Sequence, residues 1–207
     1  LPQDVRRQRV DYLLSDFNIG PNLLVVRETT GSEGAAAYRA ALEVQGAYAQ
    51  VDAEVLPLVR AAVGIRYEDA TQSVTPVDLF GGVPPVAPPA LENQYWLPAA
   101  TVTWNFAEDM QLRLGASKTI ARPQFRELAP QQYLDPELDR LFIGNPYLVD
   151  TELLNFDARY EWYFDSDQFV TLGAFYKDLD KPVEAVVNES GATVQQTYIN
   201  APKARLY

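Results

Sequence analysis

The feature that most constrains the fold of this chain is a repeated alternation of apolar and polar residues with a period of two. The clearest example is the segment 154–164, where even positions are apolar or aromatic and odd positions are mostly charged or amide. Side chains of a strand point alternately to the two faces of a sheet, so this segment predicts a strand with one apolar and one polar face. The apolar face is expected to carry Leu154, Phe156, Ala158, Tyr160, Trp162 and Phe164, and the polar face Asn155, Asp157, Arg159 and Glu161.

The same alternation recurs along most of the chain. It is clear at 59–68, 98–106 and 111–117, and weaker at 38–51 and 169–177. It starts again near Lys203, so we predict six strands and the beginning of a seventh. Residues 1–35 show no clean period and are expected to form an irregular segment, separate from the sheet region 36–207.

The predicted connections alternate in length. Short polar turns are expected at 54–57, 107–109 and 165–167, and long segments rich in Pro, Gly and Asn at 77–94, 122–150 and 179–202. In an antiparallel up-and-down sheet this order places every short turn at one end and every long loop at the other. Barrels of the bacterial outer membrane show the same asymmetry.

Aromatic residues gather near both predicted ends of the strands, as the two interfaces of a bilayer favour. Those near the short turns are Tyr48, Trp104, Phe106, Trp162, Tyr163 and Phe164, and those near the long loops are Tyr67, Tyr95, Trp96 and Tyr176. A soluble β-sandwich that binds glycans stays open as an alternative, because its strands also alternate. A sandwich, however, uses strands of about 5 or 6 residues and packs its large aromatics in the middle of the core.

Composition excludes several classes of function. With 17 basic and 28 acidic residues the formal charge is -11, which argues against a nucleic-acid partner. The absence of His and Cys closes the usual zinc, haem and Cys-nucleophile sites and every His-based triad, and we expect no metal and no cofactor. No apolar run reaches the roughly 18 to 20 residues of a spanning helix.

Catalysis by paired carboxylates is not expected. Asp157 and Glu161 share a face, but four strand residues separate them by roughly 13 Å. Glycosidase pairs need about 5 to 9.5 Å. The triplet 165–167 lacks the Gly and Glu of a calcium loop and is interpreted as a turn. We therefore expect a protein that is not an enzyme.

An ordered series of short motifs resembles the barrel domain of TonB-dependent outer-membrane receptors. The series covers about residues 36–207, and its members are Ser117-Lys118-Thr119-Ile120-Ala121-Arg122-Pro123-Gln124-Phe125-Arg126-Glu127-Leu128, Gly144-Asn145-Pro146-Tyr147-Leu148, the strand 155–164, Gly173-Ala174-Phe175-Tyr176-Lys177-Asp178 and Ile199-Asn200-Ala201-Pro202. The resemblance implies an all-β, antiparallel up-and-down transmembrane β-barrel. We expect the chain to contribute six or seven strands of a larger barrel, because open sheet edges are not tolerated in lipid.

The resemblance also implies a function and a location. In this family a plug domain inside the barrel works with the TonB complex to import a scarce ligand, so the expected function is energised uptake of an iron–siderophore or a carbohydrate across the bacterial outer membrane. No plug is recognised in this sequence, and segment 1–35 is placed outside the cell. The expected partners are the TonB complex, reached through the missing plug, outer-membrane lipid and the ligand. A passive porin-type channel is the alternative among membrane proteins.

Two sets of residues are candidates for the site. The long loop 122–150 supplies cationic and aromatic groups suited to an anionic chelate or a sugar ring, namely Arg122, Arg126, Tyr133, Arg140 and Tyr147. The competing interpretation is packing and salt bridges within that loop, against Glu127, Asp135, Glu137 and Asp139. The polar faces of the strands are expected to line the lumen, with Arg60, Arg66, Glu68, Arg113, Asp157, Arg159 and Glu161.

Overall fold

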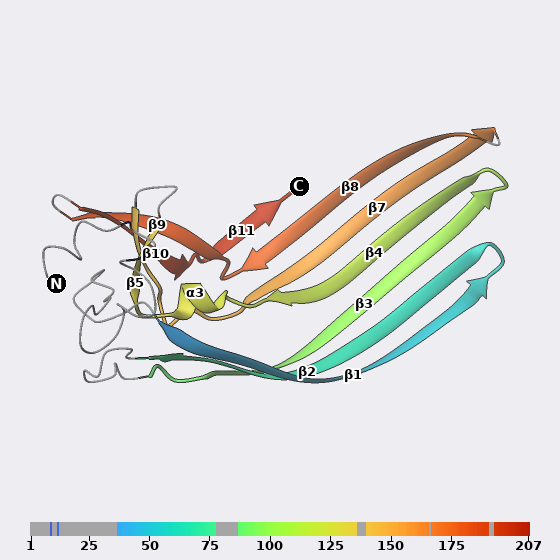
Figure 1. Cartoon of the computed structure of the whole chain (residues 1–207). Coiled ribbons are helices and arrows are strands. Elements are labelled where there is room, and N and C mark those ends of the chain that lie inside the picture. The colour runs from blue at the N-terminus through green and yellow to red at the C-terminus, as the bar shows by residue number, and fades with distance from the viewer. Residues whose placement is uncertain are drawn as a thin grey trace, which may run out of the picture.

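The protein is dominated by one long curved sheet (Figure 1). The computed structural model describes residues 9, 12, 37–77, 87–135, 140–165, 167–190 and 193–207. The irregular segment predicted at 1–35 therefore lies outside the described residues, apart from positions 9 and 12, and so do residues 78–86 of the first long connection.

Seven strands form this main sheet in the order β1-β2-β3-β4-β7-β8-β11, and every neighbouring pair is antiparallel. Their bounds are β1 Tyr38–Leu56, β2 Val59–Pro76, β3 Leu91–Ala107, β4 Met110–Ala121, β7 Thr151–Asp165, β8 Gln168–Asp180 and β11 Lys203–Leu206. The short turns all lie at one end of the sheet and the long connections at the other (Figure 1). The predicted antiparallel up-and-down class, with six strands and the start of a seventh, is confirmed.

A second, four-stranded sheet grows out of the long connections, which we had expected to be irregular. Its order is β5-β6-β10-β9, with bounds β5 Gln132–Asp135, β6 Arg140–Ile143, β9 Val183–Ser190 and β10 Thr193–Asn200. Strand β6 pairs with β10 in parallel, so this sheet joins two loops that lie about 50 residues apart in the sequence. Strands of 4 to 8 residues embedded among Pro, Gly and Asn are too short for alternation to reveal them.

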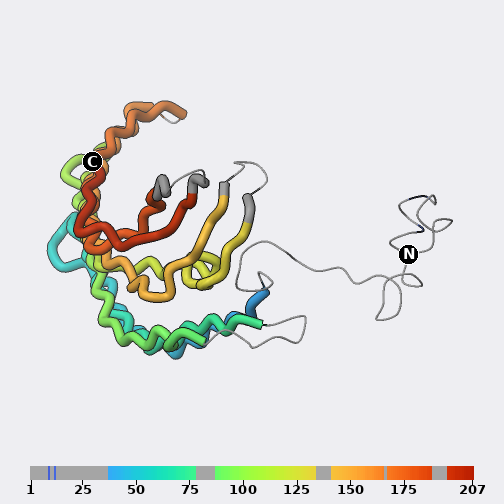
Figure 2. Tube along the Cα trace, turned by 90° about the vertical axis from the view of Figure 1, so that its left-hand side faces the viewer, coloured from blue at the N-terminus to red at the C-terminus, as the bar shows by residue number. Residues whose placement is uncertain are grey.

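The main sheet bends into an open curve, and the second sheet lies inside that curve (Figure 2). Contacts of β2 with the long connection after β4 identify the concave face: Gln72 Nε2 donates to Pro123 O at 2.7 Å, and Ala70 and Val74 of β2 are buried. Residues of β2 with even numbers therefore face the concave side, and those with odd numbers face the convex side.

The pairing register carries this assignment across the sheet. Leu114 of β4 lies opposite Val102 and Ala158, and Ala158 lies opposite Ala174, so all four side chains share the convex face. The predicted apolar face of 154–162 is the convex one, and the predicted polar face is the concave one. Three aromatics of the expected end clusters instead lie on the concave side. Tyr95 Oη donates there to Asp150 and Tyr163 Oη donates to Glu161. Tyr48 lies opposite Arg66.

The apolar side of the main sheet changes face near the long-loop end. On β2 the convex residues from Val59 to Tyr67 are Val, Ala, Val, Ile and Tyr, whereas from Asp69 onward they are Asp, Thr, Ser and Thr. Beyond Tyr67 the apolar residues, Ala70 and Val74, lie on the concave side. Strand β3 changes at the same level, because its convex residues Glu92 and Gln94 precede Trp96, which lies directly opposite Tyr67. The pairing between β2 and β3 has no register shift at this level. The apolar residues therefore change face because the sequence changes, and not because a bulge turns the strands over.

The buried core of the described residues lies between the two sheets at this loop end. Its members are Val74, Leu128, Ala129, Phe142, Leu148 and Tyr198, with Phe125, Tyr133 and Val183 packed against them. In the described part of the chain no helix has the length and apolar character needed to cross a membrane.

Candidate functional site

The first of the resembling motifs, 117–128, ends in a one-turn helix. This helix packs the long loop 122–150 against the concave face of the main sheet. Helix α3, Phe125–Leu128, starts after Pro123 and Gln124. Its first turn is held by Gln124 N, which donates to Glu127 Oε2 at 2.8 Å, and by Glu127 N, which donates to Gln124 O at 2.9 Å. Leu128 and Ala129 are buried in the core between the sheets. The sequence Pro-Gln-Phe-Arg-Glu-Leu thus sets where the 122–150 loop enters the concave side.

The second motif, at 144–148, fits against the end of this helix. Gly144 lies so close to the carbonyl oxygens of Ala129, Arg126 and Glu127 that a Cβ there would overlap backbone atoms. Asn145 N donates to Glu127 O at 2.6 Å. Glycine is therefore required at 144 by close approach of the backbone.

Two asparagines tie the two long loops together. Asn145 Nδ2 donates to Tyr198 O at 2.9 Å, and Asn145 Oδ1 accepts from Tyr147 N at 3.0 Å. From the other loop, Asn200 Oδ1 accepts from Val149 N at 2.9 Å, while Asn200 Nδ2 donates to Val149 O at 3.0 Å and to Lys181 O at 2.8 Å. We call Asn145 and Asn200 the asparagine clamp, because together they bond backbone of both loops.

An ion-pair network joins the loop to the wall of the main sheet. Glu68 lies between two guanidinium groups: Arg122 Nη2 is 2.7 Å from Glu68 Oε2, and Arg66 Nε is 2.6 Å from Glu68 Oε1. Glu68 is nearly buried at the level where the faces change. The hydrogen bonds from Arg122 and then from Arg66 hold the pKa of the Glu68 carboxyl below its usual range.

Next to this network lies a second buried carboxylate, Asp150. Its Oδ2 accepts from Tyr95 Oη at 2.9 Å and from Asn93 Nδ2 at 3.2 Å, and the residue is 6% exposed. Burial and the bond to Asp150 raise the pKa of the Tyr95 hydroxyl. Within the described residues, Asp150 Oδ1 and Arg122 Nε have no hydrogen-bond partner.

The structure brings some of the predicted ligand residues together and separates others. The Arg126 guanidinium carbon lies 5.1 Å from the centroid of the Tyr133 ring, which stacks on Phe142 at 5.2 Å. Tyr133 Oη is 3.1 Å from Tyr198 Oη. Tyr147 is 81% exposed. Arg140 begins β6 opposite Asp135.

Arg122 is the predicted ligand residue whose guanidinium forms a salt bridge with the main sheet. Its partner is Glu68 of β2, not one of the loop acids that sequence offered as partners. Arg122 therefore anchors the loop. We call the loop 122–150, with the strands and helix that it contains, the loop unit. Arg126 and Tyr147 are exposed on its surface, and the Tyr133 ring lies beneath the Arg126 guanidinium.

All seven residues predicted to line the lumen lie on the concave face. Near the short turns Arg60 pairs with Asp52 at 2.7 Å. In the middle Arg113 lies opposite Arg159, and Asp157 lies against Gly115, where a Cβ would overlap its carboxylate. Glu161 is 2% exposed and accepts from Arg159 Nε at 2.7 Å, from Tyr163 Oη at 3.2 Å and from Gln111 Nε2. These three donors satisfy the buried carboxylate.

Asp150, Tyr95, Asn145, Asn200 and Tyr198 were not among the predicted site residues. Asn145 and Asn200 stand inside the resembling motifs. The available signal was an asparagine between Gly and Pro in the first case, and an asparagine followed by Ala-Pro in the second. Asp150 gave none, because its partners Asn93 and Tyr95 lie about 55 residues earlier. In the described part of the chain no group of three or more Asp and Glu side chains is placed to hold a metal ion.

Comparison with known proteins places these features in context. Residues 5–207 match the protein family described as TonB dependent receptor-like, beta-barrel. No curated protein matches the sequence.

Two solved structures share the fold. One is a double mutant of the hemophore receptor HasR of Serratia marcescens, in complex with its hemophore HasA and heme, with 12% identity and a TM-score of 0.61 over 79% of this chain. The other is the siderophore receptor PirA of Pseudomonas aeruginosa, with 14% identity and a TM-score of 0.50 over 80% of this chain. The chain spans 30% of the first and 38% of the second.

Proposed function

The chain belongs to the TonB-dependent receptor β-barrel family, and from this premise we propose that it forms part of the barrel of an outer-membrane receptor for energised import of an iron–siderophore. Carbohydrate is the second choice of ligand. This family consists of receptors and transporters of the outer membrane. The match covers residues 5–207, which is nearly the whole sequence.

The observation that carries the proposal is the change of apolar face at the level of Tyr67 and Trp96. From this level to the short turns the convex face is apolar, as contact with hydrocarbon requires, and the concave face is polar, as a lumen requires. Beyond this level the convex face is polar and the apolar residues cover the second sheet. A strand that leaves the bilayer and continues into water has this pattern, with Tyr67, Trp96 and Tyr176 at the interface.

The ligand surface we propose is the outer side of the loop unit. Arg126 and Tyr147 are exposed there, and Tyr133 supports Arg126. A guanidinium and phenol rings suit an anionic iron chelate. HasR in complex with hemophore and heme and the siderophore receptor PirA offer the class of ligand as a hypothesis, since at 12% and 14% identity they share only the fold with this chain. Arg140 belongs to the same loop and is included in the proposed set.

Transport in this proposal depends on a plug domain and on the TonB complex. The concave residues Arg60, Arg66, Arg113, Arg159, Asp157, Glu68 and Glu161 would line the lumen that encloses the plug. No step of the transport reaction is assigned to these side chains, and the proposed role of the chain is that of receptor, not enzyme.

The test uses growth on limiting iron. A strain lacking the gene, with and without a functional TonB complex, is supplied with a panel of ferric siderophores as the iron source. In a separate iron-replete medium it is supplied with glycans as the sole carbon source. We expect one ferric siderophore to support growth only when both the gene and TonB are present. Uptake that persists without TonB would point to a passive channel, and rescue by a glycan alone would reassign the ligand.

Membrane location is tested separately by fractionation. The protein is expected in the outer-membrane fraction, and recovery as a monomer in detergent-free buffer would overturn the assignment of the convex face.

A further inference from the structure

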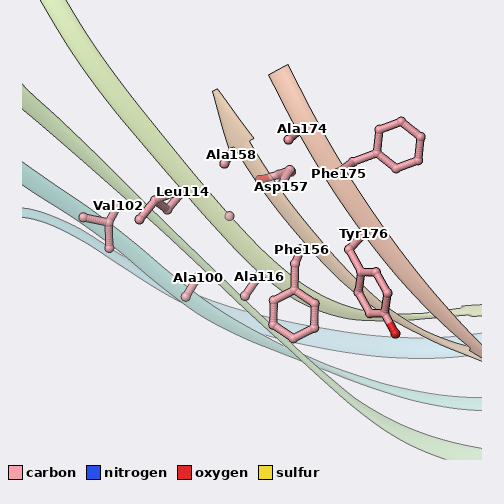
Figure 3. Close-up of a pocket in the computed structure, with 11 residues that line it drawn as sticks. Ala100, Val102, Leu114, Ala116, Phe156, Asp157, Ala158, Ala174, Phe175 and Tyr176 are labelled. Carbon is pink, nitrogen blue, oxygen red and sulfur yellow. The ribbon is translucent and has the colours of Figure 1, made fainter. Parts of the chain in front are cut away.

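The two faces of the main sheet offer different surfaces to a charged solute. Figure 3 shows a hollow of the convex face, where Ala158 and Ala174 lie near the rings of Phe156 and Tyr176. Its lining is mostly apolar and contains no Lys or Arg, so it offers no cation to an anion. On the concave face, by contrast, Arg66 presents a guanidinium beside the contact that anchors the loop unit.

The Arg66 guanidinium is bound at one nitrogen and available at the other two. Its Nε donates to Glu68 Oε1 at 2.6 Å, whereas its terminal nitrogens make no hydrogen bond with any described residue. The Arg66 side chain is 44% exposed, compared with 19% for Arg122 and 12% for Glu68. The pair of terminal N–H groups, which can bind a carboxylate in a bidentate manner, therefore remains accessible from the concave side.

The neighbouring strand β1 gives this guanidinium room. Gly46 lies opposite Glu68, and a Cβ at Gly46 would come within 2.9 Å of Arg66 Nη2. The guanidinium thus lies over bare backbone. Tyr48 lies opposite Arg66 and is 76% exposed, so a phenol stands beside the same group. A guanidinium and a hydroxyl next to a glycine suit a carboxylate ligand.

Glu68 connects this group to the loop unit, because its other oxygen accepts from Arg122. The second buried carboxylate at this level, Asp150, is bonded to Tyr95 and forms no ion pair with the described residues. An anion at Arg66 would attract Arg122 and would draw Arg66 away from Glu68. Both effects favour the bond between Arg122 and Glu68.

We propose that Arg66 binds a carboxylate group of the imported chelate on the lumen side, and that this binding tightens the docking of the loop unit through Glu68 and Arg122. The inference rests on the proposed function. It adds to the outer loop surface a second anion site, which is reached from the lumen. Because coupling between two equilibria is reciprocal, docking of Arg122 must strengthen binding of the anion by the same factor.

The experiment uses the receptor purified from outer membranes in mild detergent, with tricarballylate, an iron-free tricarboxylate, as the probe. Saturation-transfer NMR measures binding of the probe, and the rate of proteolysis in the 123–150 loop measures docking. We expect saturating tricarballylate to slow proteolysis about fivefold, the lower end of typical coupling between sites. Sodium chloride at the same ionic strength and the neutral triamide of the probe should leave the rate unchanged.

Three variants separate binding from its transmission to the loop. Arg66→Ala should lose both binding of tricarballylate and its effect on proteolysis, whereas Arg39→Ala, at an exposed guanidinium of the convex face, should keep both. Glu68→Gln should bind the probe without protecting the loop, because the shared carboxylate is gone. Arg122→Ala should bind the probe about fivefold more weakly, as reciprocity requires.

Gly46→Ala keeps every charge and tests the geometry alone. The added Cβ displaces the Arg66 guanidinium and should weaken binding of tricarballylate. Gly173→Ala is the matched control on the concave face, since a Cβ there meets no atom within 4 Å, and it should bind like the parent. This pair decides the question if Arg66→Ala does not fold.

Four results would overturn the lumen site: no binding by the unaltered receptor, unchanged binding in Arg66→Ala or Gly46→Ala, protection that sodium chloride reproduces, or protection that persists in Glu68→Gln. Each variant must first show that its barrel resists unfolding by SDS without heating. Growth on every ferric siderophore without the gene would refute the proposed function, and that result is independent of the probe.

Discussion

Arg122 donates a hydrogen bond of 2.7 Å to Glu68, and this contact joins the long loop to the wall of the main sheet. Both residues were predicted to act separately, one on a ligand and one in the lumen. Because Glu68 also pairs with Arg66, its carboxylate compensates two cations.

Replacing Glu68 by Gln should loosen this junction. The substitution keeps the shape but leaves Arg122 and Arg66 without their carboxylate, which we expect to destabilise loop docking by about 1 to 3 kcal/mol. The measurement is the rate of proteolysis in the 123–150 loop of the folded barrel. Asp52→Asn is the matched control, because its ion pair with Arg60 is exposed, and exposed pairs contribute little to stability. Equal protease resistance of the Glu68 variant and the parent would contradict the junction.

The asparagine clamp should couple the two loops. Asn145→Ala and Asn200→Ala each remove bonds to backbone groups of the neighbouring loop, and we expect each to cost about 1 to 3 kcal/mol of local stability. Amide hydrogen exchange at Val149 reports the loss, because its N–H donates to Asn200. The double variant should cost less than the sum of the two, as residues that hold one unit are not additive. Asn105→Ala, at an exposed asparagine near the short turns, should leave exchange at Val149 unchanged.

Gly144→Ala should disrupt the loop unit. The added Cβ would overlap the carbonyl oxygens of Ala129, Arg126 and Glu127, which belong to backbone and cannot turn aside. We expect a loss of about 1 to 3 kcal/mol, typical of overpacking, in the stability of the loop unit as measured by hydrogen exchange. Gly173→Ala is the control, since a Cβ there meets no atom within 4 Å. A neutral Gly144 variant would show that α3 is not packed on this residue.

Ala158→Arg tests the convex face. In the proposed orientation it places a charge in hydrocarbon, which should cost about 2 to 4 kcal/mol near the bilayer midplane. Denaturant unfolding from lipid vesicles measures this change in the free energy of unfolding. Thr171→Arg, on the concave face opposite Glu161, should cost far less. The face assignment fails if the two variants are equally stable.

The outer loop surface is tested by Tyr147→Ala and Arg126→Ala. Tyr and Arg are the residues that most often dominate binding, so each change should weaken affinity by about tenfold or more for the ferric siderophore identified in the growth panel. Stability should stay unchanged, because Tyr147 is 81% exposed and Arg126 lies on the surface. Unchanged affinity in both variants would move the ligand site elsewhere on the loops.

Sequence predicted the main sheet well because alternation is a local signal. The segment 154–164 places its two faces as expected, and the register extends that result to β4 and β8. The second sheet was missed because β6 and β10 find each other only in three dimensions, and four residues carry no readable period. The partner of Arg122 was not predicted for a related reason: Glu68 lies 54 residues away in the sequence.

The level at which the apolar side changes face has one more consequence. The pairing between β2 and β3 continues through this level without a bulge, so no change in the backbone of these two strands marks the depth of the barrel in the proposed bilayer. A few side chains therefore set the depth of insertion in the proposed orientation. Replacing Asp69 by leucine and Ala70 by serine would move the edge of the apolar belt by one strand position towards the long loops. Point substitutions at such positions would change the depth at which the barrel sits in the membrane and leave its backbone structure unchanged.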